Sequence, residues 1–503
     1  MLSYRCYAIS VLFTLGSASL QAQNKDGETV KNEHTMINMG EEKNAAGAHT
    51  MHPDAQWYPD AGLGLFIHWG LSSVKNLDAS WPMIPGRALV NKKLDSAELA
   101  RVVREKDYNL NGKPPVITPN EYWAMAKDFN PQHYDPDKWI KAAKEAGFTY
   151  AVLTTRHHEG FAMWPSNYGN FSTKNYMGGK DLIKPFVEAC RKYGLKVGLY
   201  YSPPDWYFDR EYMSFLYGRV YATNPGLPKV DADLNPRTGT PKSEAEIKKH
   251  QADFAAMVKG QVTELLTRYG KIDLIWFDGK PPIPNGENAI TQDEIRALQP
   301  GIVINPRLHG KGDFITFERN PPSQDPGGVW AEFCNLWTGS WANSNTRPFR
   351  SNGFVLGQLV ACRAWRVNYL LGVGPTSDGI FPDAVYKNMA IVQEWMKINK
   401  QAIQHTTQLP AGETASVPAT ANGKFRYLFA IPEFKDKGMM DEDMLPAKDL
   451  TLTAKISAKP RSVVLLGSSK KLQYTYTDNE LSVQLPATLR TKLVDVVQIE
   501  LQN

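Results

Sequence analysis

The stretch that decides the fold is residues 271–279, which read KIDLIWFDG. The apolar residues between 272 and 277 predict a short, fully buried strand, which Asp278 and Gly279 end abruptly. A carboxylate at the end of a buried strand costs free energy unless it is hydrogen-bonded, paired or used in chemistry. In parallel α/β folds, ligands bind and catalytic groups project at the carboxyl ends of the strands. The alternative is that Asp278 only caps a helix or forms a turn.

Strands and helices alternate on both sides of this stretch. The apolar run at 63–70 and the expected strands at 150–155, 196–201, 302–306, 329–334 and 368–373 are separated by expected helices at 96–105, 137–146, 181–193, 243–268, 292–298, 354–367 and 383–399. About seven such units predict a parallel sheet and favour a (β/α)₈-like barrel. No glycine-rich phosphate loop follows the first strand, which argues against a dinucleotide-binding sheet.

The expected organisation has four parts. Residues 1–22 carry a basic residue, an apolar run and then small residues, which is typical of a signal peptide and predicts a secreted or periplasmic protein. Residues 23–54 are polar and lack periodicity, so we expect a flexible leader. The barrel spans 55–403. The tail, 404–503, shows short strands at 424–431, 450–456, 461–466, 472–476, 481–484 and 493–501, which predict an antiparallel β-sandwich.

The composition excludes several function classes. With 42% hydrophobic and 22% charged residues, the chain is typical of a globular protein with a large core. Its net charge of +5, spread over 57 basic and 52 acidic residues, is too dispersed to indicate binding to nucleic acid or an anionic membrane. After residue 22 no apolar run reaches about 18 residues, so no membrane span is expected. We expect no metal and no cofactor, and the oligomeric state stays open.

Polar side chains at the ends of the expected strands form the candidate site. A barrel would bring them to one rim. They are His68, His157, His158, Tyr201, Asp278, Arg307, Glu318 and Glu332. The paired histidines are poor joint metal ligands, because adjacent strand residues point to opposite faces. Carboxylates with imidazoles, an arginine and nearby tryptophans instead fit glycoside hydrolysis.

Several stretches resemble glycoside hydrolase family 29, the retaining α-L-fucosidases. They are LGLFIHWGLSSV at 63–74, FNPQHYDPDKWIKAAKEAGFTYAVLTTRHHEGFAMWPS at 129–166, KDLIKPFVEACRKYGLKVGLYYSPPDW at 180–206, DLIWFDG at 273–279, INPR at 304–307, GDFITFE at 312–318 and NYLLGVGPTSDG at 368–379. The family's barrel followed by a C-terminal β-sandwich agrees with the fold predicted above. The resemblance implies an exo-acting retaining α-L-fucosidase whose partner is a fucosylated oligosaccharide or glycoconjugate.

The resemblance also implies a role for each matched residue. Asp278 is the expected nucleophile, which forms a covalent glycosyl-enzyme intermediate. The acid/base is expected to be Glu318, in the loop that resembles the family's motif after the fifth strand, with Glu332 in AEFC as the alternative. The expected sugar-binding residues are His68, Trp81, His157, His158, Tyr201, Trp276 and Arg307.

Two departures from the family pattern bear on the substrate. The family typically has Glu-Trp-Tyr after the first strand, with the Glu and Trp touching the substrate, whereas this chain has Ser80-Trp81-Pro82. Lys280 begins a Lys-Pro-Pro run where the family often places a Trp soon after the nucleophile. Loss of a carboxylate that binds hydroxyls can change which sugar is accepted. A retaining glycosidase for a modified fucose or another glycosyl unit, and a carbohydrate-binding pseudoenzyme, are therefore the alternatives.

Overall fold

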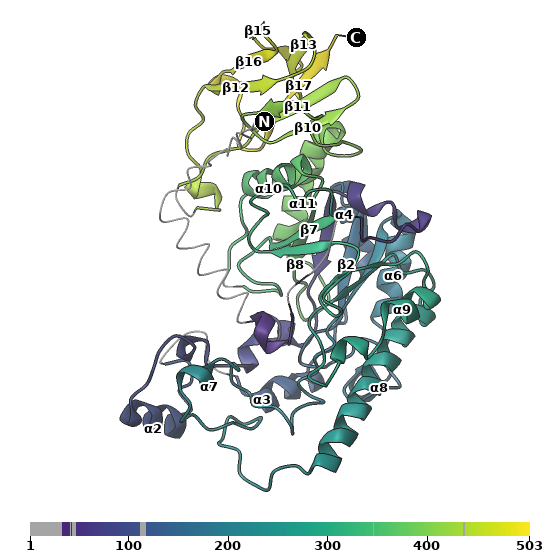
Figure 1. Cartoon of the computed structure of the whole chain (residues 1–503), viewed down its shortest axis with the longest axis vertical. Helices are drawn as coiled ribbons and strands as arrows, with labels where there is room; N and C mark the ends of the chain where they lie inside the picture. The colour runs from purple at the N-terminus through teal and green to yellow at the C-terminus, as the bar shows by residue number, and fades with distance from the viewer. Residues whose placement is uncertain are drawn as a thin grey trace, which may run out of the picture.

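The computed structural model describes residues 33–40, 42, 47–110, 117–345, 347–435 and 438–502. The predicted signal peptide lies outside these residues. Within them, an eight-stranded parallel sheet is followed by two antiparallel sheets. Figure 1 shows these parts along the long axis, with the antiparallel sheets next to the C-terminus and the parallel sheet in the middle.

The parallel sheet has the strand order β5-β4-β3-β2-β1-β8-β7-β6. Its strands are β1 (Leu63–Ile67), β2 (Tyr150–Arg156), β3 (Lys196–Tyr201), β4 (Leu274–Phe277), β5 (Val303–Ile304), β6 (Ile315–Glu318), β7 (Ala331–Leu336) and β8 (Asn368–Val373). Every described pairing in this sheet is parallel, and β5 and β6 at its two ends do not pair with each other. The prediction of a (β/α)₈-like fold is confirmed, with the barrel left open between β5 and β6.

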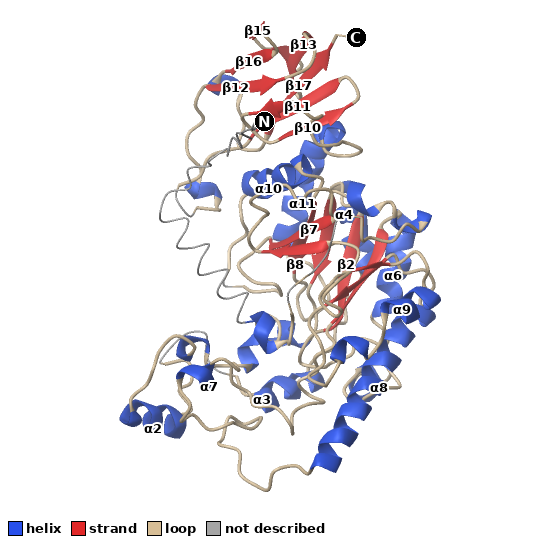
Figure 2. Ribbon diagram, in the orientation of Figure 1, coloured by secondary structure: helices blue, strands red, loops and turns tan. Residues whose placement is uncertain are grey.

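Helices flank the parallel sheet, as Figure 2 shows. They are α4 (Pro136–Glu145), α6 (Ile183–Tyr193), α8 (Glu244–Arg268), α9 (Gln292–Leu298), α10 (Asn352–Ala364) and α11 (Asp383–Asn399). Local sequence sets their ends: α8 starts at a capping box between Ser243 and Glu246, and α6 ends at Gly194 with a φ of 68°. Further helices lie in the excursions between strands: α2 (Ser96–Glu105), α3 (Pro119–Ala124), α5 (Thr173–Tyr176) and α7 (Val220–Thr223).

The C-terminal strands form the predicted antiparallel β-sandwich. One sheet contains β10 (Ala419–Asn422), β11 (Phe425–Ala430), β17 (Asp495–Leu501), β13 (Pro460–Leu465) and β14 (Lys470–Lys471); the other contains β15 (Tyr474–Thr477), β16 (Glu480–Leu485), β12 (Leu450–Lys455) and β9 (Thr414–Ala415). The sandwich is attached to the helices of the barrel. Trp395 of α11 donates from Nε1 to the carbonyl of Val494 at 2.7 Å, and Phe429 belongs to the same apolar core as the barrel.

Two predictions about chain organisation need correction. The stretch GDFITFE, expected as a loop, contains β6, which pairs with β7 so that Glu318 lies opposite Cys334. The expected leader, 23–54, is packed against the barrel in its described part: Ile37 is 1% exposed, and its carbonyl accepts a hydrogen bond from the Lys280 amide at 2.9 Å. The barrel domain therefore begins before residue 55.

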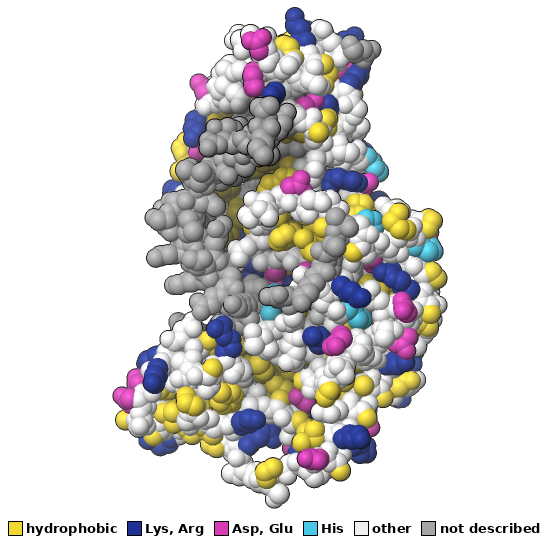
Figure 3. Space-filling model, in the orientation of Figure 1, with side chains coloured by type: hydrophobic (Ala, Val, Ile, Leu, Met, Phe, Trp, Pro, Cys, Tyr) yellow, Lys and Arg dark blue, Asp and Glu magenta, His cyan; other side chains and the backbone are white. Residues whose placement is uncertain are grey.

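The surface of the described residues carries charges of both signs, as expected from the weak net charge. On the face shown in Figure 3, lysine and arginine side chains are interspersed with aspartate and glutamate. In the described part of the chain, no helix has the length and apolarity needed to cross a membrane.

Candidate active site

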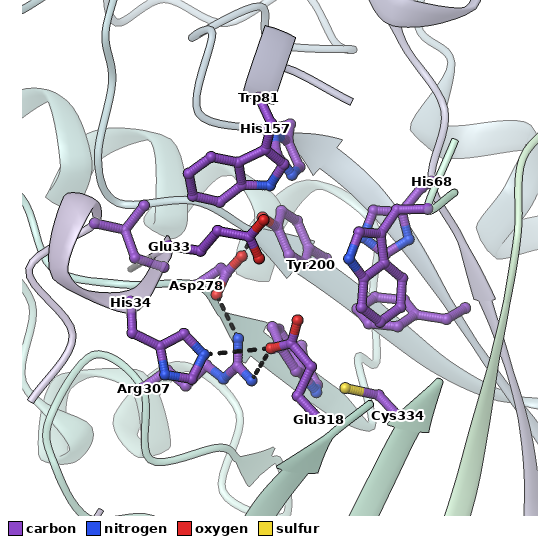
Figure 4. A pocket seen from close by; sticks show the side chains of 14 residues that line it. Glu33, His34, His68, Trp81, His157, Tyr200, Asp278, Arg307, Glu318 and Cys334 are labelled. Carbon is purple, nitrogen blue, oxygen red and sulfur yellow. Dashed lines mark hydrogen bonds and ion pairs between the residues drawn. The ribbon is translucent and has the colours of Figure 1, made fainter. Parts of the chain in front are cut away.

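A pocket lies where the carboxyl ends of the parallel strands meet (Figure 4). Charged, imidazole and aromatic side chains line it. They are Glu33, His34, Ile37, Phe66, His68, Trp81, His157, Tyr200, Trp276, Asp278, Arg307, Glu318, Cys334 and Trp341. Most of the predicted residues are among them, because the parallel sheet brings its strand ends to one rim.

Asp278 follows β4 and faces this pocket, as predicted. The hydroxyl of Tyr200 donates to its Oδ2 at 2.7 Å, and Nη1 of Arg307 donates to its Oδ1 at 2.8 Å. Nε2 of His158 lies 3.5 Å from Oδ2. The Asp278 side chain is held in one orientation, with a guanidinium compensating its charge. A carboxylate fixed in this way at the edge of a pocket is suited to nucleophilic attack.

Glu318 ends β6 and faces the same pocket. Nη2 of Arg307 donates to its Oε2 at 2.6 Å, and Nε2 of His34 lies 3.3 Å from that oxygen. Burial raises the pKa of Glu318, but the charge of Arg307 and then the hydrogen bond to His34 outweigh burial and hold this pKa well below its usual value. Glu318 is therefore a carboxylate in the unliganded protein. Arg307 lies between the two acids and binds both.

Three buried histidines lie at this wall: His68 and His157 line the pocket, whereas His158, also predicted to bind the sugar, is fully buried and does not line it. Burial lowers the pKa of His68 to about 4 and the pKa values of His157 and His158 well below the usual value, so all three are neutral at pH 7. Nδ1 of His157 lies 2.5 Å from Oγ of Ser80, and Nδ1 of His158 lies 2.6 Å from Oγ of Ser202. Among the described residues, Nδ1 of His68 and Nε2 of His158 have no hydrogen-bond partner. Neutral rings with unused nitrogens suit the hydroxyl groups of a sugar.

Tyr200, and not the predicted Tyr201, lines the pocket. Consecutive strand residues point to opposite faces of the sheet. The ring of Tyr201 lies 4.3 Å from the guanidinium of Arg156, and its hydroxyl donates to Gln261 at 3.0 Å. The motif GLYYS contains both tyrosines, so the resemblance alone could not decide between them.

Glu332 lies inside the barrel and does not line the pocket. Its carboxyl accepts hydrogen bonds from Tyr58 at 3.2 Å, from Tyr150 at 2.6 Å and from Nε1 of Trp276 at 2.9 Å. Burial raises the pKa of Glu332 to about 7, although these hydrogen bonds lower it. Glu332 therefore holds the Trp276 ring from inside the barrel. Glu318, which lines the pocket, remains the acid/base candidate.

Aromatic rings form the rest of the wall. Trp276 stacks on Tyr200 with ring centres 5.6 Å apart, and the guanidinium of Arg307 lies 4.5 Å from its ring. Trp81 is retained on the opposite side, 5.1 Å from the His158 ring. Sequence reasoning missed Trp341, whose ring centre is 4.9 Å from that of His68. Such faces pack against the apolar sides of sugar rings.

Three side chains of the site also form a group that could hold a metal ion. His157, His158 and Asp278 place ligand atoms within 4.8 Å of one another. Arg307, 2.8 Å from Asp278, opposes a second cation there, and one nitrogen of each histidine is already engaged by a serine hydroxyl. The donor set fits a neutral hydroxylated ligand better than a metal ion.

The two sequence departures have different outcomes. The ammonium of Lys280 lies 3.8 Å from Glu287 and is not among the residues that line the pocket. Ser80 is fully buried behind His157, so it binds the histidine and does not itself reach into the pocket. The missing carboxylate is therefore the departure that affects the site.

Comparison with known proteins decides the family. The model of a family described as alpha-L-fucosidase matches residues 30–401. The chain belongs to this family. It is 25% identical over 448 residues to the tissue alpha-L-fucosidase of Bos taurus, covering 84% of this chain and 82% of that protein. Identity to the Homo sapiens tissue enzyme is also 25%, over 455 residues, 86% of this chain and 85% of that one.

Solved structures agree with this assignment. Alpha-L-fucosidase isoenzyme 1 from Paenibacillus thiaminolyticus matches with a TM-score of 0.66 and 26% identity, over 90% of this chain and 99% of that one. An alpha-L-fucosidase from Bacteroides thetaiotaomicron, trapped as a covalent intermediate, shares the fold with a TM-score of 0.66 at 21% identity, over 93% of this chain and 100% of that one. The protein is a glycoside hydrolase, and its matched region includes residues 33–54 of the expected leader.

The two tyrosines of β3 provide a direct test of the site. We expect Tyr200→Phe to lower kcat/KM for an aryl α-L-fucoside by about 10- to 100-fold, because a hydrogen bond to a charged group contributes about 1.5–3 kcal/mol. Tyr201→Phe is the matched control and should stay within about threefold of the wild type. Steady-state kinetics with both variants measure this difference, and equal losses would contradict the assignment of Tyr200 to the pocket.

Proposed function

We propose that this protein is a retaining exo-α-L-fucosidase that hydrolyses terminal α-L-fucosyl residues of oligosaccharides or glycoconjugates. The observation that carries the proposal is that Asp278 and Glu318 line one pocket and share Arg307 between them. Two carboxylates at a glycosidic bond are the machinery of a glycoside hydrolase, and the covalent intermediate trapped in the Bacteroides thetaiotaomicron relative supports the retaining mechanism. Membership of the family supports fucose as the sugar, and the pocket, lined by His68, Trp81 and Trp341, supports action at a chain end.

In the first step, the carboxylate of Asp278 attacks C1 of the fucosyl unit. The C1–O bond to the leaving group breaks as a bond from C1 to the carboxylate oxygen forms, and the leaving oxygen takes a proton from Glu318. Tyr200 and Arg307 hold the attacking carboxylate in position. The neutral histidines bind the sugar hydroxyls and fix C1 against the nucleophile.

In the second step, water hydrolyses the covalent intermediate. Glu318, now a carboxylate, takes a proton from the water as its oxygen attacks C1, and Asp278 leaves as a carboxylate. The unliganded protein already holds Glu318 in this basic form. For the first step Glu318 must be protonated. A bound sugar that lengthens the contact between Glu318 and Arg307 raises the pKa of Glu318, which favours the protonated form.

We also propose that the protein works outside the cytoplasm, in the periplasm or the medium. The basic residue, apolar run and small residues at 1–22 support export. In this location the substrates are fucosylated glycans outside the cytoplasm.

The nucleophile is tested by substitution and rescue. We expect Asp278→Ala to lower turnover of an aryl α-L-fucoside by at least about 1,000-fold, because no covalent intermediate can form. Azide fits the space left by the carboxylate and should restore activity with the β-fucosyl azide as product, identified by NMR. A loss of only a few fold, or the absence of rescue, would count against Asp278 as the nucleophile.

The acid/base is tested by the dependence on the leaving group. Glu318→Ala should lower kcat/KM by about 100- to 10,000-fold for an oligosaccharide, whose leaving group needs a proton, and far less for a dinitrophenyl fucoside. Glu332→Gln is the control, because Glu332 lies beneath Trp276: its effect should be the same for both substrates. If Glu332→Gln shows the leaving-group dependence instead, the two glutamates have exchanged roles.

A further inference from the structure

The pocket contains a third carboxylate, which comes from outside the predicted barrel. It belongs to Glu33, in a segment that we call the N-terminal strap, residues 33–39. Figure 4 shows the Glu33 side chain directed into the pocket, between Trp81 and Asp278. The residue is only 4% exposed. A buried acid that faces a sugar-binding pocket needs an explanation in terms of charge or ligand binding.

The strap is fastened to the segment that follows the nucleophile. The carbonyl of Ile37 accepts a hydrogen bond from the Lys280 amide at 2.9 Å. Gly279, next to Asp278, has a φ of 89°, and a Cβ atom there would lie 2.4 Å from the Ile37 carbonyl oxygen. The backbone of the strap therefore needs glycine at position 279 to approach so closely. Beyond the strap, Glu42 accepts from the amide of Thr316 in β6 at 2.8 Å.

One of the two carboxylate oxygens of Glu33 is paired with an arginine. Nη2 of Arg87 donates to Oε1 at 2.6 Å. Oε2 lies 3.8 Å from Arg319, and among the described residues it accepts no hydrogen bond. A carboxylate has room for about four hydrogen bonds, so Glu33 retains acceptor capacity on the pocket side.

The position of Glu33 bears on the departure at Ser80. The hydroxyl of Ser80 is engaged with His157 at 2.5 Å, so residue 80 brings no carboxylate to the sugar. Glu33 enters the pocket on the side of Trp81, the residue that follows Ser80. The strap thus supplies a carboxylate near the place where the sequence motif lacks one.

We propose that Glu33 is a substrate-binding residue that determines specificity by accepting hydrogen bonds from hydroxyl groups of the fucosyl unit. The inference rests on the function proposed above. Arg87 and Arg319 hold the carboxylate in place, and the strap makes this contact part of the active site. A site that binds a hydroxyl in this way discriminates strongly against a sugar that lacks it.

The test combines Glu33→Gln and Glu33→Ala with a set of aryl α-L-fucosides, each lacking one ring hydroxyl. For the complete substrate we expect kcat/KM to fall about 10-fold in Glu33→Gln and about 100-fold in Glu33→Ala, mainly through KM, because a charge-assisted hydrogen bond is lost. For the analogue that lacks the hydroxyl bound by Glu33, wild type and Glu33→Gln should agree within about threefold.

Asn38→Gly is the matched control in the same strap. Asn38 is exposed, with a φ of 55° that glycine adopts readily, and among the described residues its side-chain amide contacts only the Lys280 carbonyl, at 3.5 Å. This variant should retain wild-type kinetics. Thermal unfolding of all variants identifies a loss that reflects folding, and if Glu33→Ala does not fold, Glu33→Gln with the deoxy substrates decides.

Three results would overturn the inference. Glu33→Gln with wild-type kinetics would show that the carboxylate does not touch the sugar. An equal loss on every deoxy analogue would assign Glu33 a purely structural role. A loss confined to poor leaving groups would make it a proton donor instead. A wild type inactive on every α-L-fucoside would overturn the proposed function itself, whereas an active wild type with unaffected Glu33 variants overturns the inference alone.

Discussion

The site depends on one buried guanidinium between two buried carboxylates. Arg307 is 4% exposed and donates to Asp278 and to Glu318 at 2.8 and 2.6 Å. Removing the guanidinium would leave two buried carboxylates with uncompensated charge, so all three side chains must be placed by the fold together. The same contact keeps Glu318 ionised before substrate arrives. The geometry of the open side of the barrel is therefore coupled to the chemistry of the pocket.

The sheet meets this constraint with polar side chains at its open side. Asn305 binds the backbone of Phe277 with both its amide oxygen and its amide nitrogen, each at 2.8 Å, which ties β5 to the end of β4. Asp313 accepts from the amide of Ile304 at 2.7 Å and donates its own amide to the carbonyl of Ile304 at 2.8 Å. The Asp313 contacts link β5 to the segment just before β6, on the side where β5 and β6 do not pair. They fix Arg307, which follows β5, between acids from β4 and β6.

Local sequence patterns predicted most of the helices and strands, but they could not predict contacts between residues that are distant in the sequence. The strands at 196–201 and 368–373 and the helices at 292–298 and 383–399 have the predicted bounds, because periodicity and end signals are local. β6 was missed because its four residues are only half-buried and at the edge of the sheet. The residues at 33–39 look disordered by composition, since their burial is supplied by the barrel and not by their own pattern.

The sequence predicted those site residues whose position follows from the carboxyl ends of the strands. Asp278, Arg307 and Glu318 lie in the pocket because parallel strands bring their carboxyl ends together. Tyr200 and Tyr201 differ only in the face to which they point, which one residue of register decides. Glu332 is the second residue of β7 and so lies near the opposite end of its strand, where Trp276, Tyr58 and Tyr150 bind it inside the barrel. Partners distant in sequence decided each of these roles.

The central claim is that Asp278 bonds to C1 of the sugar. It is tested most directly by inactivating the protein with a 2-fluoro-fucosyl fluoride, which slows the second step, followed by proteolysis and mass spectrometry of the labelled peptide. We expect one fluorofucosyl group per chain, attached to Asp278. Attachment to any other residue, or continued turnover of an α-L-fucoside with inversion at C1 and no labelling, would contradict it.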